Sequence, residues 1–335
     1  MPVNKIIGSF KLMEISTTIF TKKMRSIITI FFTLIYSISF AQFISEEKTL
    51  TTPTGNLAGT LILPKNGKIF KLVVIQAGSG PTDRNGNSGS SLKANSYRLI
   101  GEALSQKNIA TLLIDKRGVN KSMGAMKNEA SLRFDDYADD LAGWISFIKK
   151  DKRIGKIFIA GHSEGSLVGM LAAQKEKVNG YISIAGAGES IDKIITWQYA
   201  QQLPKAVAVV DSLFTRMRNK QKIDTVPPYL LSIFRPSVQP YIFSWMLHDP
   251  CAEIKKVTAP ILILQGTTDI QVEVKEAEML KACKPKATLK IITGMNHILK
   301  EAPMDRGKNI ATYANETLPL MPGLVEVIAA FVNKK

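Results

Sequence analysis

One short segment of the sequence combines residues that could perform nucleophilic catalysis. Residues 161–165 read Gly-His-Ser-Glu-Gly, with a β-branched and aromatic run at 157–159 before them and an apolar stretch of helical character after them. This order is typical of a nucleophile elbow, a strained turn between a strand and a helix that exposes a serine hydroxyl. The two glycines are expected because the tight turn leaves no room for a Cβ atom. Ser163 is therefore the candidate nucleophile.

A serine nucleophile needs an imidazole that takes up its proton and a carboxylate that holds the imidazole in one tautomer. The chain has three histidines. His162 adjoins Ser163 and projects in another direction, so we expect it to support the turn, while a capping role is sufficient for His248. His297 lies in a Gly-Met-Asn-His loop after a predicted strand, at the sheet edge where ligands bind. His297 is therefore the candidate base.

The candidate acid is Asp269, which follows Gly-Thr-Thr at the carboxyl end of a predicted strand at 261–265. Taken alone, an aspartate there could be only a turn former or the cap of the next helix. Glu273 is the alternative acid, although it is expected inside that helix. The chain order Ser163, Asp269, His297 is the order of α/β-hydrolases and differs from that of trypsin-like and subtilisin-like enzymes.

Two backbone donors must hold the oxyanion of such a reaction. One is expected from the amide of Glu164, the residue after the nucleophile, and the other from Ser79, in the Ala-Gly-Ser-Gly loop after the first buried strand. A plain flexible connection is the alternative interpretation of that loop. The sequence has no His-Glu-x-x-His motif or cluster of cysteine and histidine ligands, so neither a metal nor an organic cofactor is implied.

The elements that would position these residues alternate between strands and helices. The predicted strands are residues 57–63, 70–75, 109–114, 157–159, 181–185, 261–265 and 288–292. The predicted helices are residues 96–107, 134–150, 166–175, 272–283 and 323–333. The run KLVVIQ at 71–76 is continuous rather than alternating, which indicates a strand that is covered on both faces. The alternation predicts an α/β fold with a doubly wound, mostly parallel sheet in one domain of residues 42–335.

The strand signal stops between residues 186 and 250. Only helix-like pieces and proline-containing joints are found there, so residues 187–250 are interpreted as a helical lid insertion. A second independent domain is less consistent with a sheet that resumes near residue 261. The aromatic residues of this region would either roof an apolar acyl pocket or form the lid's own core: Trp197, Tyr199, Tyr229, Phe234, Tyr241, Phe243 and Trp245.

Five segments of the chain can be compared with known families: AGSGPTDRNGN, DKRGVNKS, GHSEGS, QGTTDIQV and GMNH. Together they resemble the α/β-hydrolase superfamily, and more narrowly the exported bacterial esterase-like members of its serine-aminopeptidase and lysophospholipase-like group. The resemblance implies a serine hydrolase that cleaves a small-molecule carboxylic ester through Ser163, Asp269 and His297. An aminopeptidase, thioesterase or transacylase with the same triad stays open, as does a binding protein of this fold that has lost turnover.

The sequence departs from the family pattern at two positions. Ala77 stands where the family usually has histidine, and Asn120 stands where it usually has glycine. Ala77 leaves open how the oxyanion loop is supported, although the backbone donor is retained. Asp115 and Arg117 are interpreted as a structural pair that braces this loop.

The first 41 residues have the features of a secretory signal peptide. Three basic residues at 22–25 precede the apolar run 27–40. Ser39 and Ala41 are the small residues that a signal peptidase recognises, so cleavage is expected after Ala41. Met24 is an alternative start of the chain. An uncleaved anchor is the alternative because residues 26–45 carry no charge. The protein is therefore expected to be exported, to the periplasm or the extracellular space.

The chain is basic, with a formal charge of +16, which falls to +12 when the signal segment is removed. Its basic residues are spread along the sequence, which favours a solvated cationic surface, and no nucleic-acid partner is expected. Peripheral association with an anionic membrane or envelope surface is compatible with this charge. Cys251 and Cys283 could form a disulfide in an oxidising compartment or remain free thiols. The sequence does not determine the acyl length of the substrate or the oligomeric state.

Overall fold

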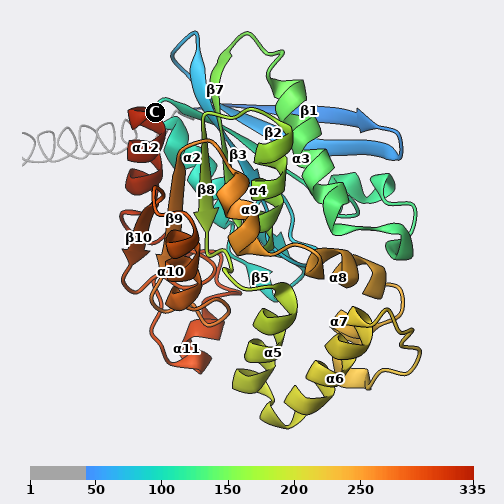
Figure 1. Cartoon of the computed structure of the whole chain (residues 1–335). Helices are drawn as coiled ribbons and strands as arrows, with labels where there is room; N and C mark the ends of the chain where they lie inside the picture. The colour runs from blue at the N-terminus through green and yellow to red at the C-terminus, as the bar shows by residue number, and fades with distance from the viewer. Residues whose placement is uncertain (1–42) are drawn as a thin grey trace, which may run out of the picture. The chain divides into compact units, whose positions relative to one another are not determined.

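A sheet of eight strands lies at the centre of the computed structural model, which describes residues 43–335 (Figure 1). In spatial order the strands are β1 (Phe43–Thr52), β2 (Gly55–Pro64), β6 (Ile109–Ile114), β3 (Phe70–Gln76), β7 (Ile154–His162), β8 (Gly180–Ile184), β9 (Ile261–Gly266) and β10 (Thr288–Ile292). β1, β2 and β6 are joined by antiparallel pairing, and the strands from β6 to β10 are parallel. The predicted mostly parallel sheet is thus confirmed, whereas the expected signal peptide lies outside the described residues.

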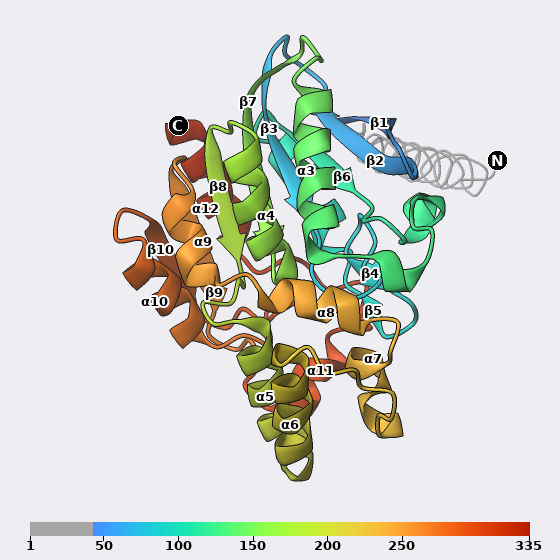
Figure 2. The same cartoon turned by 45° about the vertical axis from the view of Figure 1, so that its right-hand side comes forward.

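Helices cover both faces of this sheet (Figures 1 and 2). One face carries α3 (Phe134–Ile148), α4 (Glu164–Lys175), α9 (Pro250–Lys256) and α10 (Val274–Cys283), and the other carries α2 (Ser96–Ser105) and α12 (Leu324–Lys334). α3 shows why these segments are helical. Its apolar stripe, which includes Leu141 and Trp144, is fully buried, while Asp135 and Asp136 lie in the first turn, where the helix dipole favours negative charge.

Several short elements are absent from the sequence-based prediction. They are the hairpin β4 (Asn87–Ser88) and β5 (Leu92–Lys93), the helix α11 (Arg306–Ala311), and the 3₁₀ turns η1 (Asn120–Ala125), η2 (Glu129–Ser131), η3 (Pro204–Ala206) and η4 (Pro228–Leu230). Each is too short for an apolar pattern to repeat over several turns or strand residues, so the sequence carries no recognisable periodic signal for it.

The region between β8 and β9 is helical, as the lack of a strand signal predicts. It contains α5 (Ile191–Gln202), α6 (Val207–Arg218), α7 (Leu231–Phe234) and α8 (Gln239–Met246), and we call residues 191–246 the helical segment. In Figure 2 these helices lie beyond the carboxyl end of β8. Phe214 and Phe234 pack edge to face with ring centres 4.8 Å apart, so the segment has a small core of its own.

Two further observations concern the described chain as a whole. Cys251 and Cys283 form a disulfide between α9 and α10, with Cα atoms 5.5 Å apart, so the open question about these thiols is answered in favour of the bridge. Within residues 43–335, none of the helices combines the length and the apolar character that crossing a bilayer requires.

Candidate active site

The elbow of the sequence motif is a strained turn between β7 and α4. Ser163 has φ 54° and ψ −120°, a backbone conformation that residues other than glycine rarely adopt. Its N–H donates to the carbonyl of Ile184 at 2.8 Å, which holds the turn against β8. A Cβ atom at Gly161 would collide with the carbonyl of Gly165, and one at Gly165 would collide with the carbonyl of Gln76. The predicted requirement for glycine at both positions is therefore confirmed.

The loops after β9 and β10 bring the candidate acid and base into contact. His297 Nδ1 lies 2.8 Å from Asp269 Oδ2, and the two side chains are 6% and 1% exposed. Asp269 Oδ1 accepts the N–H groups of Gln271 and Val272 at 2.8 and 3.0 Å, so the aspartate also shapes its own loop. Burial alone would raise the pKa of Asp269, but the His297 ring and these N–H donors outweigh it and lower the pKa below its ordinary value. The carboxylate is thus ionised at neutral pH.

The candidate nucleophile, Ser163, lines two cavities. Ser163, Ser79 and His297 line a small cavity of about 100 Å³, and Ser163, Ser79 and Glu164 also line a larger one of about 520 Å³. This convergence follows from the topology, because the chain passes from β3 to β6 on one side of β3 and then crosses to β7 on the other side. Ligands bind at such a switch point of an open α/β sheet. All five residues predicted for the site thus lie at one edge of the sheet.

The alternative base His248 and the alternative acid Glu273 form contacts with other residues. His248 Nε2 is 3.1 Å from the Asp135 carboxylate on α3, and the expected capping role belongs instead to Asp249, whose side chain accepts the N–H of Cys251 at 2.9 Å. The capping prediction for His248 is therefore wrong, because its ring turns toward α3. Glu273 forms an ion pair with Lys275 at 2.6 Å.

His162 links the two loops that flank the elbow. Its Nε2 lies 2.8 Å from the carbonyl oxygen of His297, and its Nδ1 lies 2.8 Å from the hydroxyl of Tyr97. Because a carbonyl can only accept, Nε2 carries the proton, and Nδ1 accepts from Tyr97. The same hydroxyl accepts the N–H of Gly78 at 3.2 Å. His162 thus supports the turn, as expected, and also connects the loop after β3, which holds Gly78, to the loop that holds His297.

The burial of His162 predicts a pH dependence of stability. Burial, and to a smaller extent the neighbouring His297, lowers the pKa of His162 to about 3, whereas an unfolded histidine has a pKa of about 6.5. Between these pH values the unfolded chain binds more protons than the folded chain, so the free energy of unfolding decreases as pH falls and is unaffected by His162 above the unfolded pKa. We expect His162 to lower the free energy of unfolding by up to about 1.4 kcal/mol for each unit by which the pH falls within this window.

The measurement is urea unfolding at several pH values in that window for the wild type and for His162→Gln, which keeps a side-chain N–H donor but does not titrate. The variant is expected to show a shallower dependence on pH. Equal slopes for the two proteins would contradict the buried, neutral state of His162.

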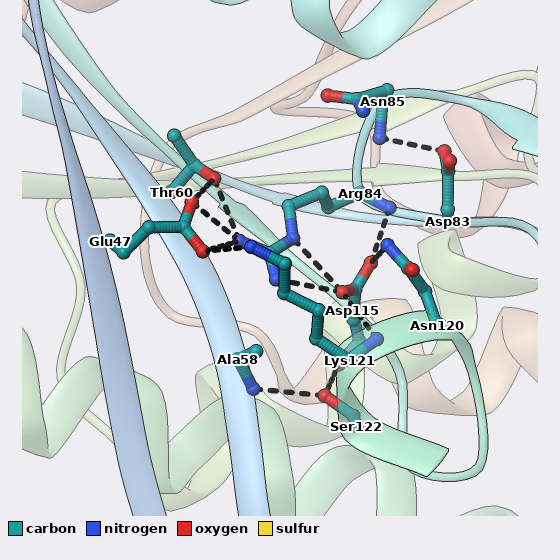
Figure 3. A network of polar contacts seen from close by, with 10 residues as sticks. All are labelled: Glu47, Ala58, Thr60, Asp83, Arg84, Asn85, Asp115, Asn120, Lys121 and Ser122. Atoms are coloured by element: carbon teal, nitrogen blue, oxygen red, sulfur yellow. Dashed lines mark hydrogen bonds and ion pairs between the residues drawn. The ribbon is translucent and has the colours of Figure 1, made fainter.

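The pairing expected between Asp115 and Arg117 is wrong. Asp115 instead accepts from the backbone N–H of Arg84 at 2.8 Å and from Arg84 Nε at 2.9 Å, as Figure 3 shows. Arg117 Nε donates to Asp140 on α3 at 3.0 Å. The two side chains leave the loop in different directions, so Asp115 fastens the loop after β3 and Arg117 fastens α3. Asn120, where the family usually has glycine, has φ 45°, a left-handed conformation that asparagine tolerates.

The larger cavity is lined mainly by apolar side chains from the sheet loops and the helical segment. They include Leu132, Leu167, Ile194, Ile195, Val238 and Ile242. The aromatic residues of the segment divide between the two expected roles. Tyr241 and Trp245 line the cavity, Phe234 belongs to the segment's own core, and Tyr229 is exposed. Both interpretations of these residues are therefore correct in part.

Each carboxylate that lines this cavity has a cationic partner. Glu129 pairs with Arg235. Glu164 lies 3.1 Å from Lys116, and Glu189 lies 3.5 Å from Lys193.

Tyr97 and Lys116 are site residues that the sequence analysis did not identify. Both are buried. Tyr97 is on α2, where its spacing predicts only a core position. Lys116 follows a buried strand inside the DKRG segment, and a charged residue in that place is the one signal that could have indicated it.

Comparisons with known proteins identify the family of the chain. Residues 87–302 match the family described as serine aminopeptidase, S33. Over 260 residues the chain is 26% identical to the esterase EstD of Thermotoga maritima, an alignment that covers 76% of this chain but only 60% of that relative.

Two solved structures share the fold at low sequence identity. Est1E from Butyrivibrio proteoclasticus, solved with ferulic acid bound, has a TM-score of 0.56 and 17% identity over 86% of this chain and 96% of its own. An esterase from Pyrococcus furiosus has a TM-score of 0.58 and 17% identity over 88% of this chain and 91% of its own.

Proposed function

This chain belongs to the serine aminopeptidase S33 family of α/β-hydrolases, and we propose that it is a serine hydrolase that cleaves carboxylic esters. The observation that carries the proposal is the contact between Asp269 and His297 beside a cavity that Ser163 also lines. The relative EstD, which bears the name esterase, supports the same reaction class.

In the proposed mechanism the Asp269 carboxylate fixes the proton of His297 on Nδ1, so Nε2 is available as a base. Ser163 Oγ gives its proton to Nε2 and attacks the ester carbonyl carbon, whose oxygen becomes an oxyanion. The N–H groups of Ser79 and Glu164 hold that oxyanion. Its collapse breaks the bond to the alcohol, which leaves with the proton from Nε2. Water, activated by His297, then releases the acid from Ser163.

The paired carboxylates of the larger cavity favour an ester over an aminoacyl substrate. An aminopeptidase must hold the free α-ammonium group of its substrate, and a carboxylate is the natural partner of that charge. Among the described residues, the three acidic side chains that line the cavity, Glu129, Glu164 and Glu189, are already ion-paired. The remaining lining is mainly apolar and suits an acyl chain.

A series of p-nitrophenyl esters of increasing acyl length tests this assignment. We expect kcat/KM to rise by about fourfold for each added methylene until the cavity is filled, because burial of one methylene is worth about 0.8 kcal/mol. Thioesters of the same acyl groups and aminoacyl p-nitroanilides are measured beside them. Faster cleavage of an anilide with a free α-amine would contradict the ester assignment, and faster cleavage of the thioesters would favour a thioesterase.

We further propose that the protein acts outside the cytoplasm, after removal of residues 1–41. The basic and apolar pattern at the start of the sequence supports export. The Cys251–Cys283 disulfide is consistent with an oxidising compartment. N-terminal sequencing of the protein from its expressing cells should give a chain that begins at Gln42, whereas retention of residues 1–41 would contradict cleavage.

A further inference from the structure

Lys116 is a buried cation at the centre of the candidate site. It follows β6, and its side chain is 1% exposed. Nζ lies 3.1 Å from the Glu164 carboxylate, donates to the carbonyl of Gly78, and lies 5.1 Å from the centre of the Tyr137 ring. A lysine is rarely buried to this extent without a specific set of partners. Two of these partners adjoin the candidate oxyanion donors, since Gly78 precedes Ser79 and Glu164 is itself a candidate donor.

The contact with Gly78 determines how the next amide points. The carbonyl of Gly78 and the N–H of Ser79 belong to one peptide unit, and none of the described peptide bonds is cis. In a trans unit the C=O and N–H point in opposite directions. A cation that holds the Gly78 carbonyl therefore turns the N–H of Ser79 away from itself.

The contact with Glu164 fixes the second donor. Glu164 is the first residue of α4, where a backbone N–H has no partner within the helix. Within residues 43–335, neither the N–H of Glu164 nor that of Ser79 donates to another protein group. Lys116 thus holds one donor residue through its side chain and the other through the preceding carbonyl.

We propose that Lys116 is a positioning residue that fixes the Ser79 and Glu164 amides relative to each other, an inference that rests on the proposed serine-hydrolase function. Its charge also polarises the Gly78–Ser79 peptide, which strengthens the N–H as a donor. The Glu164 carboxylate balances that charge, so the buried pair is neutral overall where the oxyanion forms. Lys116 also lines the larger cavity, but in this role it acts through the backbone.

A purely structural role would have a different signature. Removal of Lys116 alone leaves the Glu164 carboxylate buried without its cationic partner, which destabilises the fold whatever the lysine does in catalysis. The double variant Lys116→Met/Glu164→Gln removes both charges and avoids this effect, yet it still lacks the bond to the Gly78 carbonyl. Comparison of Lys116→Met with the double variant therefore separates positioning from ion pairing.

The experiment measures the rates of two reactions and the stability to urea for each protein. The reactions are the phosphonylation of Ser163 by a fluorophosphonate and the steady-state hydrolysis of a p-nitrophenyl ester, and the stability is the urea midpoint. Lys71→Met is the matched control, because Lys71 Nζ also donates to backbone carbonyls, those of Val332 and Asn333, but at the opposite end of β3 from Ser79.

In both Lys116 variants we expect the phosphonylation rate and kcat to fall together by about 10- to 100-fold, less than the loss of an oxyanion donor itself. KM is expected to stay within about threefold, because the donors act mainly in the transition state. The double variant should recover the urea midpoint without recovering kcat, and Lys71→Met should match the wild type in both rates.

Recovery of kcat together with the urea midpoint in the double variant would overturn the proposal, since the lysine would then serve only the ion pair. So would a wild-type phosphonylation rate in either Lys116 variant. If the wild type is labelled at Ser163 but cleaves no ester, the ester proposal fails, while the phosphonylation rates still decide the role of Lys116. Absence of labelling in the wild type would overturn both.

Discussion

Ser163→Ala is expected to lower kcat for an ester substrate by about 10⁴- to 10⁶-fold, because no other group would form the acyl-enzyme. The alanine keeps the Cβ atom and the backbone of the elbow, so the fold and the cavities should be preserved. Steady-state hydrolysis of a p-nitrophenyl ester, with circular dichroism to check folding, measures the effect. Ser146→Ala is a matched control on α3, where the half-buried hydroxyl donates to Glu176, and its kcat should equal that of the wild type. More than about 1% residual activity in Ser163→Ala would show that another nucleophile acts.

Asp269→Asn is expected to lower kcat by about 10⁴-fold with a small change in KM. An asparagine amide can donate to His297 Nδ1, which places the ring proton on Nε2 and removes the base from Ser163. The pKa of Asp269 is already below its ordinary value, so the wild-type carboxylate stays ionised as pH falls through the weakly acidic range. The loss should therefore be of similar size at every pH between about 6 and 8.

Glu273→Gln provides the comparison for this second prediction. Glu273 is the alternative acid from the sequence and forms an ion pair with Lys275 near α10. Its amide variant is expected to keep kcat within about twofold of the wild type, because the half-buried Glu273–Lys275 pair lies outside the Asp269–His297 contact. A large loss of kcat in Glu273→Gln together with a small loss in Asp269→Asn would reverse the assignment of the acid.

The fold and the placement of the candidate residues could be predicted because they depend on local patterns. Buried strands alternate with helices, and parallel strands present their carboxyl ends at one edge of the sheet. The loops with Ser163, Asp269 and His297 each follow such a strand, so their proximity follows from topology. The glycine positions of the elbow were predictable because the turn geometry itself excludes a Cβ atom.

The partners of the buried charges could not be predicted in the same way. Lys116 is 38 residues from Gly78 and 48 residues from Glu164 in the sequence, and no local pattern specifies contacts over such separations. The same limit explains the incorrect pairing of Asp115 with Arg117. Two charges close in sequence suggested a pair, whereas the path of each side chain depends on which loop packs against it.

Mapping the site of covalent modification tests the central claim most directly. The wild-type protein is treated with a fluorophosphonate, digested with protease and analysed by tandem mass spectrometry. A single adduct on the hydroxyl of Ser163, formed more slowly in Asp269→Asn, is the predicted result. Modification of a different side chain, or none at all in a correctly folded protein, would contradict the proposed catalytic arrangement.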